Sequence, residues 1–441
     1  MNRECSSGRF QAMSLEPGIT YYYLPDDKWK TLSLNIFCKV PMAKDMVTRI
    51  ALVPRLARRG TVNLPSLRDL SRRLEDMYGA GLGADTSKIG PMQVVRFAMS
   101  LPSPEFVKGA ADGVFSHGVN LGKAMSFIWE VASKPYLEDG AYPKDRFETE
   151  REEHRRDILS IINNRPRYAT VRLVEEVSKG DPSGLPAWGT LEELNRIGPK
   201  DTWDAWTTTL SRSGISIYAI GKGVRELGDI LARTRLDFPK ARVAAEVGAE
   251  KRLSPPSPPK ELLAVEEYLP GEQTILCMAF YTGITESDAR LPAQIFFDGI
   301  LGGFPHSKLF VNVREKEHLA YFADSSLNPW RGMVLTVAGV MDSFRDKARD
   351  LVSMQVEAMK KGDITEDEIE NTRVGLLRRY RSESDSQAAL VRRFLSTEIL
   401  GGPATEEELV EQVMRVTKDD IVEVANCAQL KAVYTLRAKD D

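Results

Sequence analysis

A proline-rich segment, PPSPP at residues 255–259, most constrains how this 441-residue chain folds. Proline fixes its own φ angle and removes a backbone donor, so two proline pairs exclude both a helix and a central strand. Such a segment is typical of a semi-rigid linker. It predicts an N-terminal domain at 1–245, a linker at 246–268 and a C-terminal domain at 269–441.

The two halves repeat the same order of elements. Segments 31–40 and 274–283 alternate in hydropathy, which predicts a strand in each half. ADTS at 84–87 and ADSS at 323–326 then occur at matching places, and each leads into another strand-like segment. Such self-similarity indicates a duplication. The rest of each half is mainly helical, so we expect an α+β fold with two homologous domains, each a mostly antiparallel sheet with helices packed on it.

Composition argues against several classes of function. The chain has 60 basic and 63 acidic residues, and this balance gives no support to binding of nucleic acid or of an anionic membrane. No apolar run of about 18 residues occurs, so no membrane span is expected, and the N-terminus lacks the apolar core of a secretory signal. Four scattered cysteines without a C-x-x-C motif favour a reducing cytoplasm.

The histidines do not form a recognisable metal motif. Neither H-E-x-x-H nor H-x-x-E-H occurs, and no two histidines have the i, i+4 spacing that places two zinc ligands on one helical turn. The four are His117, His154, His306 and His318. In TEREEHRRD (149–157), Glu150 and Glu153 are candidates for an acid–base pair or metal ligands. The same pattern is also typical of a solvated helix with i, i+4 ion pairs.

A second candidate lies in VREKEHLAYF, residues 313–322. If one helix ran through this stretch, Arg314 and Tyr321 would share a face, because seven residues are nearly two turns. A guanidinium and a phenol suit the binding of a carbonyl or carboxylate. The alternative is an ordinary surface arginine and a half-buried tyrosine. Just upstream, the glycine pair of ILGGF (300–304) would let a peptide backbone approach closely.

These stretches together resemble the pitrilysin/insulinase family of zinc peptidases. ILGGFPHSKLFVNVREKEHLAYFADSS (300–326) is similar to the family's second domain, with its Gly-rich loop, Ser-x-Leu-Phe, Arg-Glu-Lys and Leu-Ala-Tyr. RRGTVNLPSLRDLSRRLEDMYGAGLGADTSKIG, GLPAWGTLEELNRIGPKDTWDAW and VTKDDIVEVA extend the likeness over nearly the whole chain. The resemblance implies the family's duplicated domain fold.

The resemblance also implies that the zinc-binding half of the site is lost. Anchoring on the Gly-Thr pair that follows the family's H-x-x-E-H motif places that motif on ALVPR. Ala51 and Arg55 then replace the two ligand histidines, and Pro54 replaces the glutamate base. The distal ligand is matched by Asp157, and the glutamate seven residues earlier by Glu150. None of the first three side chains ligates zinc, so we expect no cofactor in this chain.

The arginine–tyrosine pair is retained. The resemblance implies that Arg314 and Tyr321 hold the peptide carbonyl opposite zinc, and that Gly302, Gly303 and Phe304 bind substrate. In two-chain members, such as the mitochondrial processing peptidase, zinc and this pair sit on different subunits. The chain is also similar to a bacterial subgroup encoded beside a zinc-bearing paralogue.

The implied function is therefore that of a cytoplasmic, non-catalytic subunit that donates this pair to a partner. The partner would carry H-x-x-E-H and the zinc, and the substrate would be a peptide. Two alternatives stay open: a peptide-binding or scaffold protein without hydrolysis, and a peptidase with an unorthodox metal site. A homodimer of the isolated chain also stays open.

Overall fold

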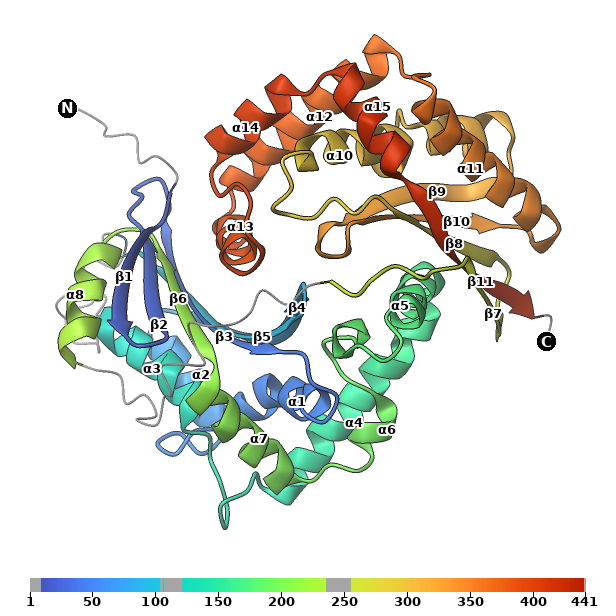
Figure 1. The fold of residues 1–441 in the computed structure, drawn as a ribbon. Coiled ribbons are helices and arrows are strands. Elements are labelled where there is room, and N and C mark those ends of the chain that lie inside the picture. The colour runs from blue at the N-terminus through green and yellow to red at the C-terminus, as the bar shows by residue number, and fades with distance from the viewer. Residues whose placement is uncertain (1–8, 104–105, 107–120, 235–254, 440–441) are drawn as a thin grey trace, which may run out of the picture. The chain divides into compact units, whose positions relative to one another are not determined.

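The computed structural model describes residues 9–103, 106, 121–234 and 255–439 (Figure 1). The chain divides into two compact units. Unit 1 comprises the described parts of 1–158, 185–253 and 387–394, and unit 2 comprises those of 159–184, 254–386 and 395–441.

Unit 1 is built on a six-stranded sheet with the order β1-β2-β6-β3-β5-β4. Its strands are β1 (Gln11–Glu16), β2 (Ile19–Leu24), β3 (Thr31–Pro41), β4 (Gly81–Ile89), β5 (Met92–Pro102) and β6 (Gly214–Ile220). All neighbours are antiparallel except β2 and β6. Alternate residues of β3, such as Leu32, Leu34 and Ile36, are fully buried on one face, as the hydropathy pattern predicts.

Helices cover that apolar face of the unit 1 sheet. The described helices of this unit are α1 (Val47–Ala57), α2 (Leu67–Asp76), α3 (Leu121–Ser133), α4 (Lys144–Ser160), α6 (Leu191–Leu194), α7 (Pro199–Arg212) and α8 (Val224–Thr234). The core is formed between the sheet and α1, α3, α7 and α8, with Trp206 of α7 fully buried. Helix α2 begins at a capping box in which Ser66 and Asp69 each accept a bond from the other's backbone N–H.

Unit 2 is built on a five-stranded sheet with the order β7-β11-β8-β10-β9. Its strands are β7 (Leu263–Pro270), β8 (Thr274–Tyr281), β9 (Ala320–Asn328), β10 (Met333–Val340) and β11 (Gln429–Lys439). The helices on one face are α10 (Leu291–Asp298), α11 (Arg345–Lys360), α12 (Glu366–Ser384), α14 (Glu406–Arg415) and α15 (Lys418–Cys427). Helix α13 (Gln387–Leu400) is divided between the units after Phe394.

The two sheets share one topology. In each, the first paired strand of the repeat lies parallel to the last strand, as β2–β6 and as β7–β11. The next three strands follow in the same antiparallel order, β3-β5-β4 and β8-β10-β9. The predicted α+β fold with two homologous domains is therefore confirmed.

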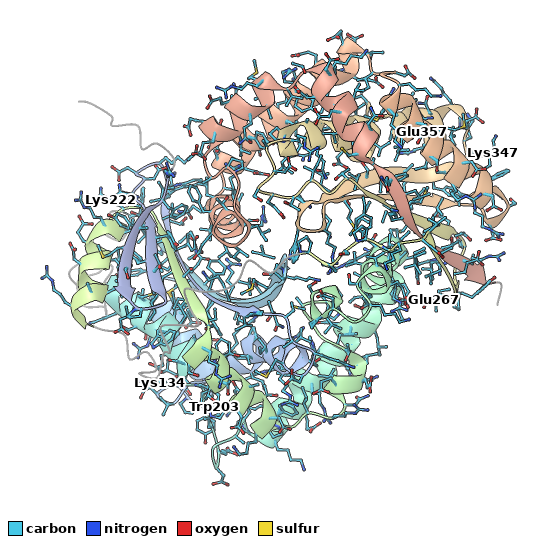
Figure 2. All side chains as sticks on the ribbon, viewed as in Figure 1. Lys134, Trp203, Lys222, Glu267, Lys347 and Glu357 are labelled. Atoms are coloured by element: carbon cyan, nitrogen blue, oxygen red, sulfur yellow. The ribbon has the colours of Figure 1, made fainter. Side chains whose placement is uncertain are left out.

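Unit 2 also includes a helix from the N-terminal half of the sequence, α5 (Arg165–Val177). Ala169, Leu173 and Val177 pack on the second face of the unit 2 sheet. The Tyr168 hydroxyl donates to Glu267 of β7 at 2.5 Å, and Figure 2 shows Glu267 beside this helix. This packing buries β8 on both faces, which explains why every residue of that strand is apolar or buried.

The predicted division of the sequence at 246–268 remains a proposal. Residues 246–254 lie outside the described residues, and β7 begins inside the remaining part, at Leu263. Unit 2 also takes residues 159–184 from the range 1–245. The compact units are thus not continuous in sequence.

Candidate functional site

The positions matched to the zinc motif lie on α1. This helix buries Ala51 and Pro54, while Arg55 is half-buried. Pro54 stands inside the helix, where it lacks a backbone donor and has no side-chain group that could accept a proton. Neither Ala51 nor Pro54 offers a donor atom to a metal.

Three polar side chains lie in one stripe along the face of α4 that is directed at α1. Glu150, His154 and Asp157 are four and three residues apart, so they follow the same face of α4. Glu150 and His154 are buried, with only 6% and 5% of their surfaces exposed. The interpretation of 149–157 as a solvated helix is therefore wrong for Glu150 and His154, whereas Glu153 and Asp157 are exposed and form ion pairs, as that interpretation expects.

Arg55 joins two of these carboxylates. Its guanidinium forms an ion pair with Asp157 and approaches Glu150 at 3.7 Å. Arg59, two residues beyond the end of α1, also pairs with Glu150. Arg59 was not predicted as a site residue, although its position four residues after Arg55 was an available signal. A protein cation thus neutralises the carboxylates at the position that the resemblance assigns to zinc.

The remaining polar group of this stripe is fixed by a backbone bond. His154 Nε2 donates to the carbonyl oxygen of Trp188 at 2.8 Å. Burial lowers the pKa of His154, and the positive charge of Arg55 lowers it further. The residues present do not fit zinc, because two of the three motif positions lack a donor and the third is a cation. Within the described ranges, no group of three His, Cys, Asp or Glu side chains is arranged to hold a metal ion.

Arg314 and Tyr321 belong to different elements. Arg314 lies on η5, a π-helical segment (Leu309–Lys316), and Tyr321 lies on β9. The helix ends before His318, which adopts a left-handed conformation with φ +51° and turns the chain into the strand. The pair therefore does not lie on one continuous helix face, and its geometry comes from the packing of η5 against β9.

Both side chains of the pair are exposed. The Arg314 guanidinium lies over the Phe310 ring, 4.8 Å from its centroid, and no acidic group of the described residues is within ion-pair distance of it. Arg314 is close enough to Asp324 of β9 to lower that carboxyl's pKa, against the larger effect of burial, which raises it. Tyr321 exposes 57% of its surface. Arginine and tyrosine thus both retain free donors.

The glycine-rich loop packs against the same strand. Gly302, in the π-helical turn η4 (Gly299–Gly303), approaches β9 so closely that an added Cβ would lie 2.4 Å from the backbone nitrogen of Ser325. Gly303 is half-buried beside Asp298. The Ser325 hydroxyl donates to the Asp298 carboxylate at 2.7 Å, and burial raises the pKa of Asp298 to about 6.

Phe304 anchors the end of this loop. Its ring stacks on the His306 ring at 5.4 Å and lies under the Arg379 guanidinium at 5.0 Å. His306 Nε2 in turn contacts the Thr372 hydroxyl at 2.9 Å. The structure thus brings Gly302 and the strand of Tyr321 together, and it holds Phe304 in an aromatic stack. His117, another of the sequence candidates, lies outside the described residues.

The chain is similar to known peptidase homologues described as inactive. Residues 224–376 match the family model of the peptidase M16 inactive domain. The chain is 26% identical, over 96% of each sequence, to a Bacillus subtilis (strain 168) protein named probable inactive metalloprotease YmfF.

Solved structures show the same fold. A conserved protein from Enterococcus faecalis V583 is 26% identical, with a TM-score of 0.88 over 98% of this chain and 99% of that one. A peptidase M16 inactive domain from Pseudomonas fluorescens is 18% identical, with a TM-score of 0.75 over 98% of this chain and 100% of that one. No helix in the described part of this chain has the length and apolar character needed to cross a membrane.

Proposed function

Since this chain belongs to the pitrilysin/insulinase (M16) peptidase family, as a homologue of its inactive members, we propose that it is the non-catalytic, substrate-binding subunit of a heterodimeric zinc metallopeptidase. The observation that carries the proposal is a contrast between two arginines. Arg55 is neutralised by carboxylates at the lost metal position. Arg314 is exposed and lies over the Phe310 ring, and its effect on the pKa of the nearby Asp324 carboxyl is smaller than that of burial.

In the proposed complex, a paralogue with an H-x-x-E-H motif supplies zinc, which activates water for attack on a peptide bond. Arg314 and Tyr321 donate hydrogen bonds to the carbonyl oxygen of that peptide bond. These bonds strengthen as negative charge develops on the oxygen, so they favour the transition state over the bound substrate. The cation–π contact with Phe310 fixes Arg314 without occupying its N–H donors.

A location in the cytoplasm is part of this proposal. Among the described residues, Cys38, Cys277 and Cys427 are not joined in a disulfide, which supports a reducing compartment. The isolated chain is free to form a homodimer, and the heterodimer is the state to which we assign function.

A second candidate function is peptide binding or scaffolding without hydrolysis. It is favoured by the edge strands β4 and β9, because an edge strand presents backbone groups to which an extended peptide can pair. Gly81 and Gly83 leave β4 without bulky side chains at two positions. This candidate requires no zinc-bearing partner.

Reconstitution separates the two candidates. The purified chain should show no peptidase activity alone, and activity should appear on mixing with an H-x-x-E-H paralogue. Arg314→Ala should then lower kcat by about 10²-fold, as loss of one oxyanion donor does in other peptidases. Arg378→Ala, which removes another exposed arginine of unit 2, is the matched control. Full activity of the Arg314→Ala complex would refute donation by this chain.

A further inference from the structure

The start of β9 contains a β-bulge at Tyr321. On the neighbouring strand β10, Gly339 lies opposite Phe322, and the next residue, Val340, lies opposite Ala320. Tyr321 is therefore the extra residue and has no partner across the ladder. A bulge of this kind bends the strand and redirects the side chain of the inserted residue. Accordingly, Tyr321 is 57% exposed whereas Ala320 before it is buried.

The residue opposite the bulge has no side chain, and its place is taken by an aromatic ring. A Cβ added to Gly339 would lie 2.3 Å from Cε1 and 3.0 Å from Cδ1 of Phe322. The Phe322 ring therefore lies directly on the Gly339 backbone. It also packs against the apolar cluster between the sheet and α5. An aromatic ring over a cross-strand glycine is a recurring way to pin the register of a strand.

Contacts on either side hold the rest of this short segment. Before the bulge, the Leu319 backbone N–H donates to the Val313 carbonyl at 3.1 Å, and Leu319 is 5% exposed. After it, Ser325 is bound by Asp298 and covered by Gly302. Among residues 319–325, Tyr321 is thus an exposed side chain on a backbone that is fixed from both ends.

We infer that Phe322 and Gly339 are positioning residues that set the direction of the Tyr321 hydroxyl, an inference that rests on the proposed function. The ring holds Phe322 opposite Gly339, and because Ala320 lies opposite Val340, the extra residue between these two pairs is Tyr321. Loss of the ring, or a methyl group on Gly339, removes this preference. Without it, the extra residue can move from Tyr321 to Phe322, which places Tyr321 opposite Gly339 and turns its side chain toward a different face.

Two variants test the inference in the reconstituted complex. Gly339→Ala adds a methyl group that forces the Phe322 ring away from Gly339. Phe322→Ala removes the ring without adding any atom. The second variant therefore tests the same contact if Gly339→Ala does not fold. We expect each to lower kcat by about tenfold to a hundredfold, as a misplacement of about 1 Å does, while KM changes by less than about threefold.

Matched controls exclude general effects of substitution. Gly362→Ala adds a methyl group in the turn after α11 of unit 2, where a Cβ meets its nearest atoms only at 3.9 Å and φ is +78°, so it also controls for general destabilisation. Phe344→Ala removes a ring that is 39% exposed elsewhere in unit 2. Both controls should keep the wild-type kcat. A wild-type kcat in folded Phe322→Ala or Gly339→Ala, or an equal loss in the controls, would overturn the inference.

Amide hydrogen exchange of the isolated chain provides a second measurement that does not depend on activity. Both variants should exchange faster than wild type in the peptide covering 319–325, and unchanged exchange there would count against the inference. Tyr321→Phe and Arg314→Ala are measured in parallel. If these two retain full activity, the proposed function fails, whereas the exchange experiment still decides whether Phe322 and Gly339 hold the bulge.

Discussion

Replacement of Arg55 by alanine tests whether a protein cation has taken over the structural role of a metal. The side chain connects α1 to α4 through Glu150 and Asp157. The Asp157 contact is at the surface, with 62% of that side chain exposed, so it contributes about 0.2–1 kcal/mol. The Glu150 contact matters more, because this carboxylate is buried.

The magnitude at Glu150 depends on its second partner. Removal of the sole partner of a buried charge costs about 3–5 kcal/mol. Glu150 keeps its ion pair with Arg59 when Arg55 is lost, so we expect only about 1 kcal/mol from this contact. Arg55→Ala should therefore lower the free energy of unfolding by roughly 1–2 kcal/mol. For a unit of this size that corresponds to a fall in Tm of roughly 2–8 °C.

Thermal unfolding followed by circular dichroism measures the change, with Arg58→Ala as the control. Arg58 is the exposed C-cap residue of α1 and should be neutral within about 0.5 kcal/mol. The Arg55→Ala/Arg59→Ala double variant should lose more than the sum of the single variants, because Glu150 then has no cation left. Equal Tm values for Arg55→Ala and Arg58→Ala, or a double variant that is merely additive, would refute the reasoning.

Three further predictions concern the metal position and the glycine loop. The double variant Ala51→His/Arg55→His restores two zinc ligands at i, i+4 beside an acidic residue of α4, and it removes the competing cation. Zinc should therefore raise the Tm of this variant and leave the Tm of wild type unchanged. Mass spectrometry of the metal content checks the stoichiometry. Burial raises the pKa of Asp298 to about 6, above its unfolded value, so the native state holds the proton more tightly and stability is lost as pH rises from about 4 to 6. A Tm series over this range should show that roughly 2–3 kcal/mol of pH dependence disappears in Asp298→Asn, and an unchanged slope would contradict the assignment. Gly302→Ala should destabilise unit 2 by more than about 2 kcal/mol because its Cβ meets the β9 backbone at 2.4 Å, whereas Gly303→Ala meets its nearest atom at 3.2 Å and should cost about 1 kcal/mol or less; similar losses for both would contradict this difference.

Local patterns were sufficient for much of the fold. The alternation in 31–40 predicts β3, whereas the strand predicted at 274–283 is β8, which does not alternate because it is buried on both faces. The matching positions of the two segments in the two halves predict the shared sheet topology. Both signals are properties of neighbouring residues. The packing of α5 in unit 2 has no such local signal, because Ala169 and Leu173 contact a sheet whose strands occur about 100 to 260 residues later in the chain.

The candidate site shows the same limit. The resemblance selected Arg55 and Asp157 as lost ligand positions, but not their ion pair, because pairing depends on the angle between α1 and α4. Spacing alone placed Arg314 and Tyr321 on one helix face, whereas His318 ends that helix with a left-handed residue. A histidine seldom adopts this conformation, so the sequence carries little warning of it.

The duplication gives these differences a common frame. The helix after the first long strand of each repeat is α1 in unit 1, and α10 with the loop turn η4 in unit 2. In the first, Arg55 is held by two carboxylates, so its donors are occupied within the fold. In the second, Gly302 brings that turn onto β9, and Arg314 lies over the face of Phe310 with the Asp324 carboxyl nearby. A ring face binds the guanidinium plane and leaves its N–H edges unbonded. In the proposed function, this difference is why we assign donation to an incoming carbonyl to Arg314 and not to Arg55, whose donors are occupied by ion pairs.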